Sequence, residues 1–285
     1  MRWQFGRRSD NVEDRRGRGG AGPVLVGGGG IGAVVLAVIV LLLGGDPSVI
    51  FQGAQTRQGP SSAPTQTSPE QDELAEFVSV VLADTEDTWN SKFQQIGRDY
   101  QEPSLVLFSD AVESACGYAQ AAVGPFYCPA DEKVYIDLSF FQAMESRLGA
   151  PGDFAQAYVV AHEVAHHVQN QLGISDQVRQ AQQQVSRTEA NQLSVRLELQ
   201  ADCLAGIWAN TTSQSENVAL EQGDIQEGLN AASAIGDDRL QRKSQGYVVP
   251  DAFTHGSSEQ RVRWFTKGLE TGDVAQCDTF ATSQL

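Results

Sequence analysis

The sequence AHEVAHH at Ala161–His167 determines which fold the rest of the chain is expected to build. Successive residues of an α-helix turn by about 100°, so His162 and His166 project from one face of a helix and Glu163 lies beside them. This spacing is the pattern H-E-x-x-H. Two neutral imidazoles so arranged can hold a zinc ion, while the neighbouring carboxylate takes a proton from water that the zinc activates. The stretch therefore predicts a hydrolytic zinc site on a helix.

The residues around this stretch predict the helix itself. Apolar residues recur at helical spacing on both sides of the motif, Asp153 is the expected N-cap, and Gly173 follows the expected last turn. The apolar positions are Phe154, Ala157, Tyr158, Ala161, Val164, Ala165, Val168 and Leu172. The alternative is a chance match on a solvated helix face. Against it, three of the chain's 4 histidines fall within this one stretch.

A third metal ligand is predicted farther along the chain. Glu198 and Asp202 lie four residues apart and share a helix face. Glu198 would complete a site of two histidines and one carboxylate for one zinc ion, leaving the fourth position to water. Asp202 would accept the free N–H of a ligating histidine and fix its tautomer. The alternative, an ordinary charged helix face, does not account for the coincidence with H-E-x-x-H.

Together the two motifs resemble the gluzincin pattern of zinc peptidases. Four stretches are similar to the putative neutral zinc metallopeptidase family, from about residue 70 to the end of the chain: VVAHEVAHHVQNQLG, LELQADCLAG, GPFYCPADEKVYIDLSFF and THGSSEQRVRWF. The resemblance implies a mostly helical zinc peptidase domain in which His162, His166 and Glu198 bind the metal and Glu163 is the catalytic base. It implies no particular substrate.

The fourth histidine, His255, lies in the last of these stretches. Zinc peptidases need a hydrogen-bond donor for the oxyanion that forms when the peptide carbonyl is attacked. The segment around His255 is similar to a His-Pro-containing stretch of membrane-associated gluzincins, with Gly256 in place of proline. His255 is therefore a candidate donor. The alternative is a surface or N-cap histidine at this position, with Tyr247 as the substitute donor. His167 is expected to be structural or to support a ligand.

The N-terminal part of the chain differs in composition from the rest. Residues 1–22 are polar, hold 6 Arg against 3 acidic residues, and are expected to be loose. Residues 23–43 form an uncharged apolar run that is long enough to span a bilayer as one helix. The arginines before the run predict a single-pass anchor in the cell membrane, with a cytoplasmic N-terminus and an extracytoplasmic catalytic domain. A cleaved signal peptide is the competing interpretation, but no A-x-A site follows the run.

The remaining residues predict a linker and one folded domain. Residues 44–68 are rich in Gly, Ser, Thr, Pro and Gln, as in a flexible linker, and the zinc peptidase domain is expected at residues 69–285. Strands are predicted at residues 104–108 and 133–138, and the second is expected to lie beside the zinc helix and to pair with extended substrate. Further helices are expected at residues 69–97, 193–208, 216–232 and 257–269.

The chain contains 4 cysteines and no C-x-x-C motif. Outside the cytoplasm cysteines can pair, so disulfides are predicted between Cys116 and Cys128 and between Cys203 and Cys277. Free thiols or a second metal site are the alternatives.

The net charge of the protein limits which molecules it is expected to bind. The net charge is −16 for the whole chain. It becomes about −19 without residues 1–22, which argues against binding to nucleic acid.

These features together predict an α+β, mainly α, zincin-like metallopeptidase domain with a small β-sheet on a single N-terminal transmembrane helix. The predicted function is zinc-dependent hydrolysis of peptide bonds in a peptide or protein substrate outside the cytoplasm. Two alternatives stay open: a catalytically silent protein that binds zinc or peptide, and a structural protein of the cell envelope. The sequence leaves cleavage specificity and oligomeric state open.

Overall fold

The computed structural model describes residues 1–17, 67–120, 124–215 and 217–285. The expected membrane anchor at residues 23–43 and nearly all of the expected linker lie outside the described residues. Within the described ranges, no helix is both long and apolar enough to cross a membrane. The described part is mainly helical, with two small sheets, as expected from the sequence.

The larger sheet has the strand order β1-β2-β6-β5. Its strands are β1 (Val12–Asp14), β2 (Ser104–Phe108), β6 (Lys133–Asp137) and β5 (Phe126–Cys128). β1, β2 and β6 run parallel, and β5 pairs antiparallel with β6. A separate hairpin joins β3 (Ala111–Ser114) to β4 (Gly117–Gln120). The two strands predicted from the sequence are therefore confirmed.

The expected role of residues 133–138 in pairing with substrate stays a prediction, because only part of this strand has partners on both edges. β2 pairs with β6 along residues 133–137, whereas β5 pairs with residues 133–135 alone on the other edge. A strand can add a new partner only at an edge with free backbone groups. The outer strand on the side of the zinc helix is β5, which the sequence did not indicate because it has only three residues.

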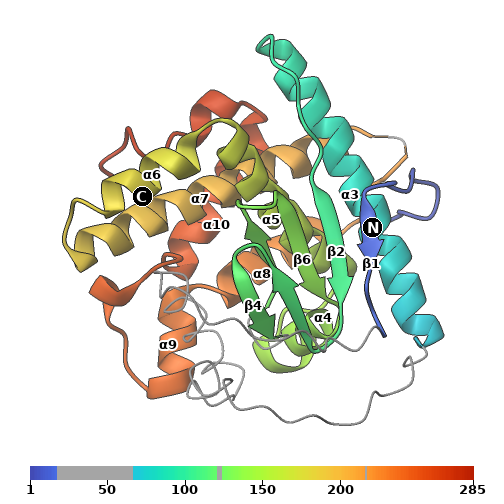
Figure 1. The fold of residues 1–285 in the computed structure, drawn as a ribbon, viewed down its shortest axis with the longest axis horizontal. Helices are drawn as coiled ribbons and strands as arrows, with labels where there is room; N and C mark the ends of the chain where they lie inside the picture. The colour runs from blue at the N-terminus through green and yellow to red at the C-terminus, as the bar shows by residue number, and fades with distance from the viewer. Residues whose placement is uncertain (18–66, 121–123, 216) are drawn as a thin grey trace.

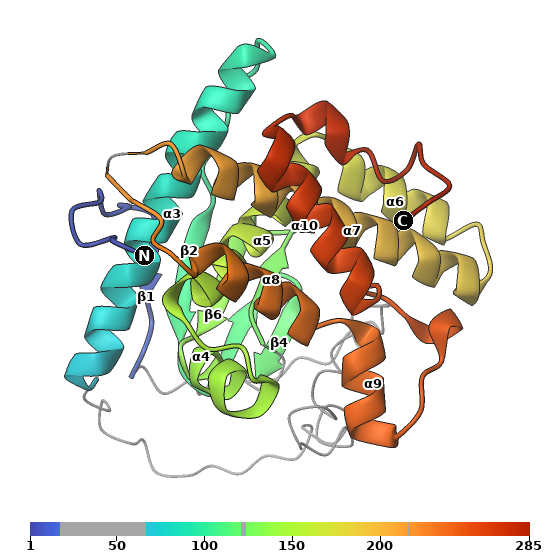
Figure 2. The ribbon, with the colours of Figure 1, turned by 180° about the vertical axis from the view of Figure 1, so that it is seen from behind.

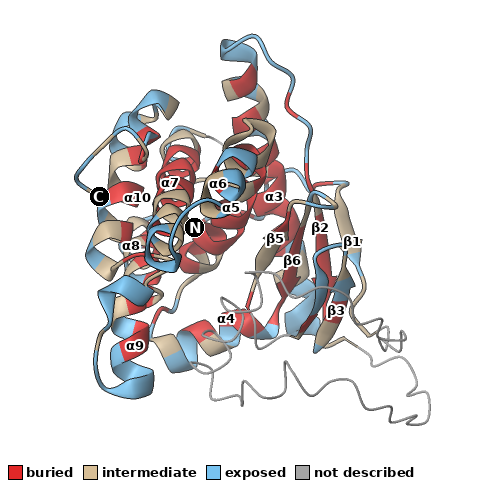
Figure 3. Cartoon of the chain, turned by 60° about the vertical axis from the view of Figure 1, so that its left-hand side comes forward, coloured by how far each residue is buried: buried red, intermediate tan, exposed pale blue. Residues whose placement is uncertain are grey.

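The helices gather mainly on one side of the sheet, as Figure 3 shows. They are α3 (Pro69–Gln95), α4 (Ser139–Ala143), α5 (Asp153–Gln171), α6 (Ile174–Gln182), α7 (Arg187–Thr212), α8 (Asp224–Ala234), α9 (Asp237–Gln245) and α10 (Ser258–Thr271). A π-helical turn at Met144–Leu148 and short 3-10 turns at Pro250–Ala252 and Val274–Cys277 complete them. α6 and α9 are short polar helices that the sequence analysis did not predict.

Side-chain caps explain where three of the helices begin. The side chains of Ser68, Ser186 and Ser257 each accept a hydrogen bond from the backbone N–H three residues on. The side-chain oxygen at that position in turn accepts from the backbone N–H of the serine. The helix starts expected at residues 69 and 257 are therefore confirmed to within one residue. The N-cap of α5 is Gly152 and not Asp153, and α8 begins later than residue 216.

Helix α5 is the centre of the hydrophobic core. It packs against α3, α7, α8 and the strand β5, and Figures 1 and 2 show it enclosed from both sides of the molecule. The seven apolar residues predicted on this helix from Phe154 to Val168 are all buried. Helices α7 and α10 meet in a close crossing, because a Cβ at Gly206 or Gly268 would collide with the backbone of the other helix. The crossing brings side chains of α10 next to the metal-site residues of α7.

Both expected disulfides are present. Cys116 is bonded to Cys128 at the hairpin, and Cys203 of α7 is bonded to Cys277 near the C-terminus. The second bond closes a loop of 74 residues that contains α8, α9 and α10.

Residues 1–17 are part of the same folded body, so the expectation that they are loose is wrong. Trp3 is buried against Phe77 of α3 with ring centroids 5.5 Å apart. Arg7 donates to the buried Glu86 carboxylate at 2.9 Å. β1 pairs with β2, and Figure 1 shows this segment beside α3. Their polar composition suggested a loose segment, but the charged side chains of residues 1–17 have specific partners in the fold.

This packing conflicts with an N-terminus on the opposite side of a membrane from the domain. A single crossing by residues 23–43 would separate β1 from β2, whereas the structure pairs them. We expect residues 1–17 and the domain to share one compartment. The test is labelling of the full chain with a membrane-impermeant maleimide after Phe5→Cys or Ile96→Cys, two positions that are 87% and 57% exposed.

Equal labelling of the two variants in intact spheroplasts and in lysed cells is the expected result. The four native cysteines are disulfide-bonded and do not compete. Labelling of one position only before lysis and of the other only after it would contradict the shared compartment.

Candidate metal centre

Three side chains from two helices meet at one point. His162 and His166 project from α5, and Glu198 projects from α7, which packs against it. The Nε2 atom of His162 lies 3.1 Å from Glu198 Oε2, and that of His166 lies 3.5 Å from Glu198 Oε1. One nitrogen or oxygen atom of each residue lies within 4.8 Å of the others. The three residues predicted as metal ligands are therefore together, with both Nε2 atoms turned toward the carboxylate.

The far side of His162 is held by a buried carboxylate. Asp202 lies one turn after Glu198 on α7, and its Oδ1 atom is 2.9 Å from His162 Nδ1. Tyr158 donates its hydroxyl to the same oxygen at 2.5 Å. Arg261 of α10 donates to both carboxylate oxygens, from Nε at 2.8 Å and from Nη2 at 2.9 Å. Asp202 is thus positioned to fix the His162 tautomer, as the sequence predicted.

The electrostatics of the cluster favour positive charge at its centre. Burial by itself lowers the pKa of His162, but Asp202 and Glu198 outweigh it and raise that pKa to about 9. Burial raises the pKa of Glu198, yet the two histidines hold it well below its usual range. A carboxylate that stays ionised between two imidazoles can bind a metal cation there.

Glu163 lies beside the cluster and is chemically distinct from Glu198. Its side chain is buried on α5, and burial is the largest influence on its pKa, which is raised. A carboxyl group with a raised pKa is a better proton acceptor near neutral pH than an ordinary surface carboxylate. This property suits the role of general base that the sequence predicted for it.

His255 is partly buried and firmly held. Its Nδ1 atom lies 3.2 Å from Asp237 Oδ1. The other carboxylate oxygen of Asp237 accepts backbone N–H groups of Thr254, His255 and Gly256 at 2.7, 2.7 and 3.1 Å. Burial lowers the pKa of His255, but Asp237 and then Glu198 outweigh it, so the pKa is raised. Because the charge of Glu198 contributes to this shift in pKa, His255 lies within electrostatic range of the candidate metal centre.

The other two polar candidates have different settings. His167 is fully buried and links three segments, with Nδ1 3.0 Å from the Tyr127 hydroxyl and Nε2 2.6 Å from the Gln101 carbonyl. Both of its nitrogens are therefore used within the fold. Tyr247 is 62% exposed, whereas His255 is fixed by a buried carboxylate.

The sequence analysis missed several residues that build the site. Tyr158 precedes His162 by one helical turn and could have been noticed on the same helix face. Arg261 lies in the stretch THGSSEQRVRWF, but nothing in the sequence indicates that it reaches Asp202. Asp237 lies 18 residues before His255, and no spacing rule connects them.

A second group of carboxylates, Asp153, Asp224 and Glu227, lies at the beginning of α5 and α8. The Met1 ammonium group donates to Asp153 at 2.7 and 2.8 Å and to Asp224 at 3.4 Å. Asp153 and Asp224 therefore already have a cationic partner. The His162, His166 and Glu198 set is the stronger metal candidate, because imidazoles are preferred zinc ligands.

The donor set fits zinc: two imidazole Nε2 atoms and one ionised carboxylate are a known ligand set of catalytic zinc. The chain belongs to the family described as "Putative neutral zinc metallopeptidase", whose model matches residues 1–280. The match includes the N-terminal segment, which lies before the region where the sequence analysis found the resemblance.

Two relatives illustrate the range of this family. The chain is 54% identical to the uncharacterized protein YpfJ of Escherichia coli strain K12, over 99% of this chain and all of the relative. It is 42% identical to the uncharacterized protein Rv2575 of Mycobacterium tuberculosis, over 73% of each chain. No solved structure matches the chain significantly.

The geometry predicts that Glu198 is required for metal binding. Glu198→Gln should weaken zinc binding by more than about a hundredfold, because it removes the carboxylate that, among the described residues, contacts both imidazoles. Competition with a chromophoric chelator measures the change. The matched control is Glu189→Gln, an exposed carboxylate on the same helix where glutamine preserves the capping box. Equal zinc affinity in the two variants would mean that another residue is the third ligand.

Proposed function

We propose that this protein is a zinc-dependent metallopeptidase that hydrolyses peptide bonds in a peptide or protein substrate. The observation that carries the proposal is the position of the buried Glu163 on α5, where the charges of His162, His166 and Glu198 all act on its carboxyl group. A bound zinc ion acts there as a Lewis acid that lowers the pKa of water and polarises a carbonyl. The protein must then supply a base, an oxyanion donor and a rigid frame.

The described residues meet these needs. Glu163 takes the proton from the attacking water, and the raised pKa of its carboxyl group lets it hold that proton and then give it to the leaving amine. The contact between Asp202 and Nδ1 orients His162, so that the Nε2 lone pair faces Glu198. Arg261 neutralises Asp202, because a buried carboxylate without a partner would be costly.

His255 is the proposed oxyanion donor. Asp237 holds its Nδ1 atom, so the Nε2 atom is the one available to the substrate. Nε2 can donate only when it carries a proton, and the Asp237 carboxylate favours the doubly protonated ring. A fixed donor of this kind stabilises charge on the peptide oxygen as the carbonyl is attacked.

The sheet suggests how an extended peptide binds. β5 is the outer strand and packs against α5, the helix that carries H-E-x-x-H. An extended substrate that pairs with a free strand edge gains backbone hydrogen bonds without regard to its side chains. We place the reaction outside the cytoplasm, because two disulfides persist in an oxidising compartment.

The first test is Glu163→Gln. The amide keeps the shape of the side chain but cannot accept the proton of water, so kcat should fall by at least about a thousandfold while the zinc content stays that of the wild type. Peptide-library digestion, with and without a chelator, measures the activity, and metal analysis measures the zinc. Turnover at the wild-type rate in Glu163→Gln would refute the proposed mechanism.

The role of His255 has a distinct pH signature. A raised pKa keeps His255 protonated above its ordinary value of about 6.5, and the donor is lost as the pH rises through the raised value. Asp237→Asn removes the charge but keeps an oxygen for the backbone N–H groups. We therefore expect the alkaline limb of kcat to move to lower pH, and His255→Ala to lower kcat by about a hundredfold with zinc retained.

These changes are measured by pH–rate profiles of the purified variants. An alkaline limb that does not move in Asp237→Asn, together with a normal kcat in His255→Ala, would leave His255 as a structural histidine.

A further inference from the structure

The two histidines of the candidate centre are held from behind in different ways. His162 contacts the Asp202 carboxylate, whereas His166 Nδ1 lies 2.9 Å from the side-chain oxygen of Gln169, a neutral amide on its own helix. Gln169 is fully buried and continues away from the metal centre into a chain of hydrogen bonds. These hydrogen bonds end at the backbone carbonyl of Cys277, whose side chain is bonded to Cys203.

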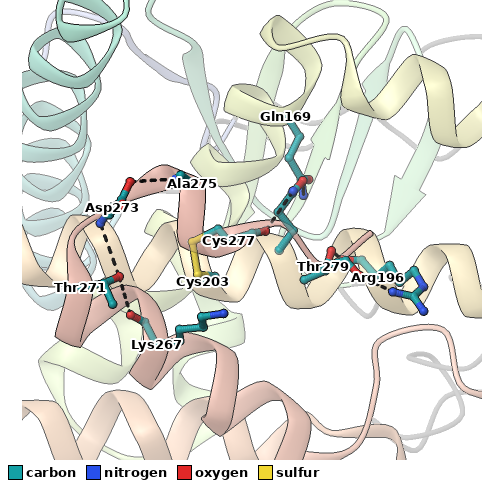
Figure 4. Close-up of a disulfide and its surroundings, with 10 residues drawn as sticks. Gln169, Arg196, Cys203, Lys267, Thr271, Asp273, Ala275, Cys277 and Thr279 are labelled. Atoms are coloured by element: carbon teal, nitrogen blue, oxygen red, sulfur yellow. Dashed lines mark hydrogen bonds between the residues drawn. A yellow bond between two sulfur atoms is a disulfide. The ribbon is translucent and has the colours of Figure 1, made fainter. Parts of the chain in front are cut away.

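Each hydrogen bond in this series is short. Gln169 Nε2 donates to Gln200 Oε1 at 3.0 Å and to the Leu197 carbonyl at 2.7 Å. Gln200 Nε2 donates to the Cys277 carbonyl at 3.1 Å. Figure 4 shows Gln169 directed toward Cys277 beside the sulfur–sulfur bond. The chain therefore crosses from α5 to α7 and then to the C-terminal segment.

The direction of every hydrogen bond follows from its two ends. A backbone carbonyl can only accept, so Gln200 must turn its NH2 group toward Cys277 and its oxygen toward Gln169. Gln169 must then donate to Gln200, and the Leu197 carbonyl makes the same demand. The oxygen of Gln169 is left for His166. Reversing either amide would set two acceptors against each other in a buried position.

The last step determines the state of the imidazole. Because the oxygen of Gln169 accepts, Nδ1 of His166 must carry the proton, and in a neutral ring Nε2 is then a free lone pair. That Nε2 atom is the one turned toward Glu198. A metal ligand must present such a lone pair.

We propose that Gln169 and Gln200 are positioning residues that fix His166 in the Nδ1–H tautomer, with the Cys277 carbonyl as the fixed end of the chain. This inference rests on the proposed zinc site. It assigns a role to the disulfide between Cys203 and Cys277, which holds that carbonyl against α7. The disulfide between Cys116 and Cys128 lies at the hairpin and has no part in the chain.

The direct test is the tautomer of His166 in the full polypeptide stripped of metal, measured by 15N NMR of labelled histidine at a pH high enough to keep the ring neutral. With 4 histidines in the chain, the signals can be assigned by single substitutions. We expect the Nδ1–H form in the wild type and a shift toward the Nε2–H form in Gln169→Leu. An Nε2–H form in the wild type would overturn the proposal.

Zinc affinity supplies a second readout. Gln169→Leu should weaken zinc binding by about 10- to 100-fold. Gln200→Leu should weaken it less, because the Leu197 carbonyl still orients Gln169. The matched control is Gln241→Leu. Gln241 is another buried glutamine, which accepts a hydrogen bond from the backbone N–H of Val249 and takes no part in the hydrogen bonds between His166 and Cys277. Equal zinc affinity in Gln169→Leu and Gln241→Leu would reduce Gln169 to a packing residue.

Paired cysteine variants separate the two disulfides. Replacing Cys203 and Cys277 by serine should weaken zinc binding, whereas replacing Cys116 and Cys128 should leave it unchanged. The same loss in both pairs would contradict a specific role for the Cys277 carbonyl. A wild-type chain that binds zinc but cleaves no peptide would refute the proposed function and leave this inference standing, because tautomer and affinity are measured without substrate.

Discussion

The structure of the candidate centre depends on one buried carboxylate. Asp202 of α7 contacts His162 and Tyr158 of α5 and forms an ion pair with Arg261 of α10, so it joins three helices at a single point. A buried charge is tolerated only when it is fully paired, and Asp202 has a partner on each side. The close crossing of α7 and α10 at Gly206 and Gly268 makes the pair with Arg261 possible. The two glycines therefore allow the helices to approach closely, and this approach allows Arg261 to balance the charge of Asp202.

This constraint also explains why the two imidazoles are supported differently. A carboxylate behind each histidine would add a second buried negative charge near Glu163 and Glu198. His166 is held instead by the neutral amide of Gln169, whose direction is set by backbone carbonyls. One histidine is thus oriented by a charge that Arg261 balances, and the other by hydrogen-bond geometry alone. Both arrangements leave the Nε2 atom for a metal.

Residues of the site that lie within one or two turns of the same helix could be predicted from the sequence, whereas residues brought together by tertiary contacts could not. H-E-x-x-H and the Glu198–Asp202 pair were predictable, because helical periodicity turns a four-residue spacing into a shared face. Gln169, three residues after His166, was accessible by the same rule but was not noticed. Arg261 and Asp237 act across tertiary contacts that no periodicity encodes, and the N-terminal segment is held by charged side chains whose composition resembles that of a loose leader.

The proposed activity requires a zinc ion held by two imidazoles and a carboxylate. X-ray absorption spectroscopy of the purified full chain, together with metal analysis, tests this arrangement without reference to any substrate. We predict one zinc per chain with two imidazole nitrogens, oxygen atoms in the remaining positions and no sulfur. A chain that retains no zinc under conditions of stoichiometric supply, or a zinc signal with sulfur or a single imidazole in its coordination sphere, would contradict the account.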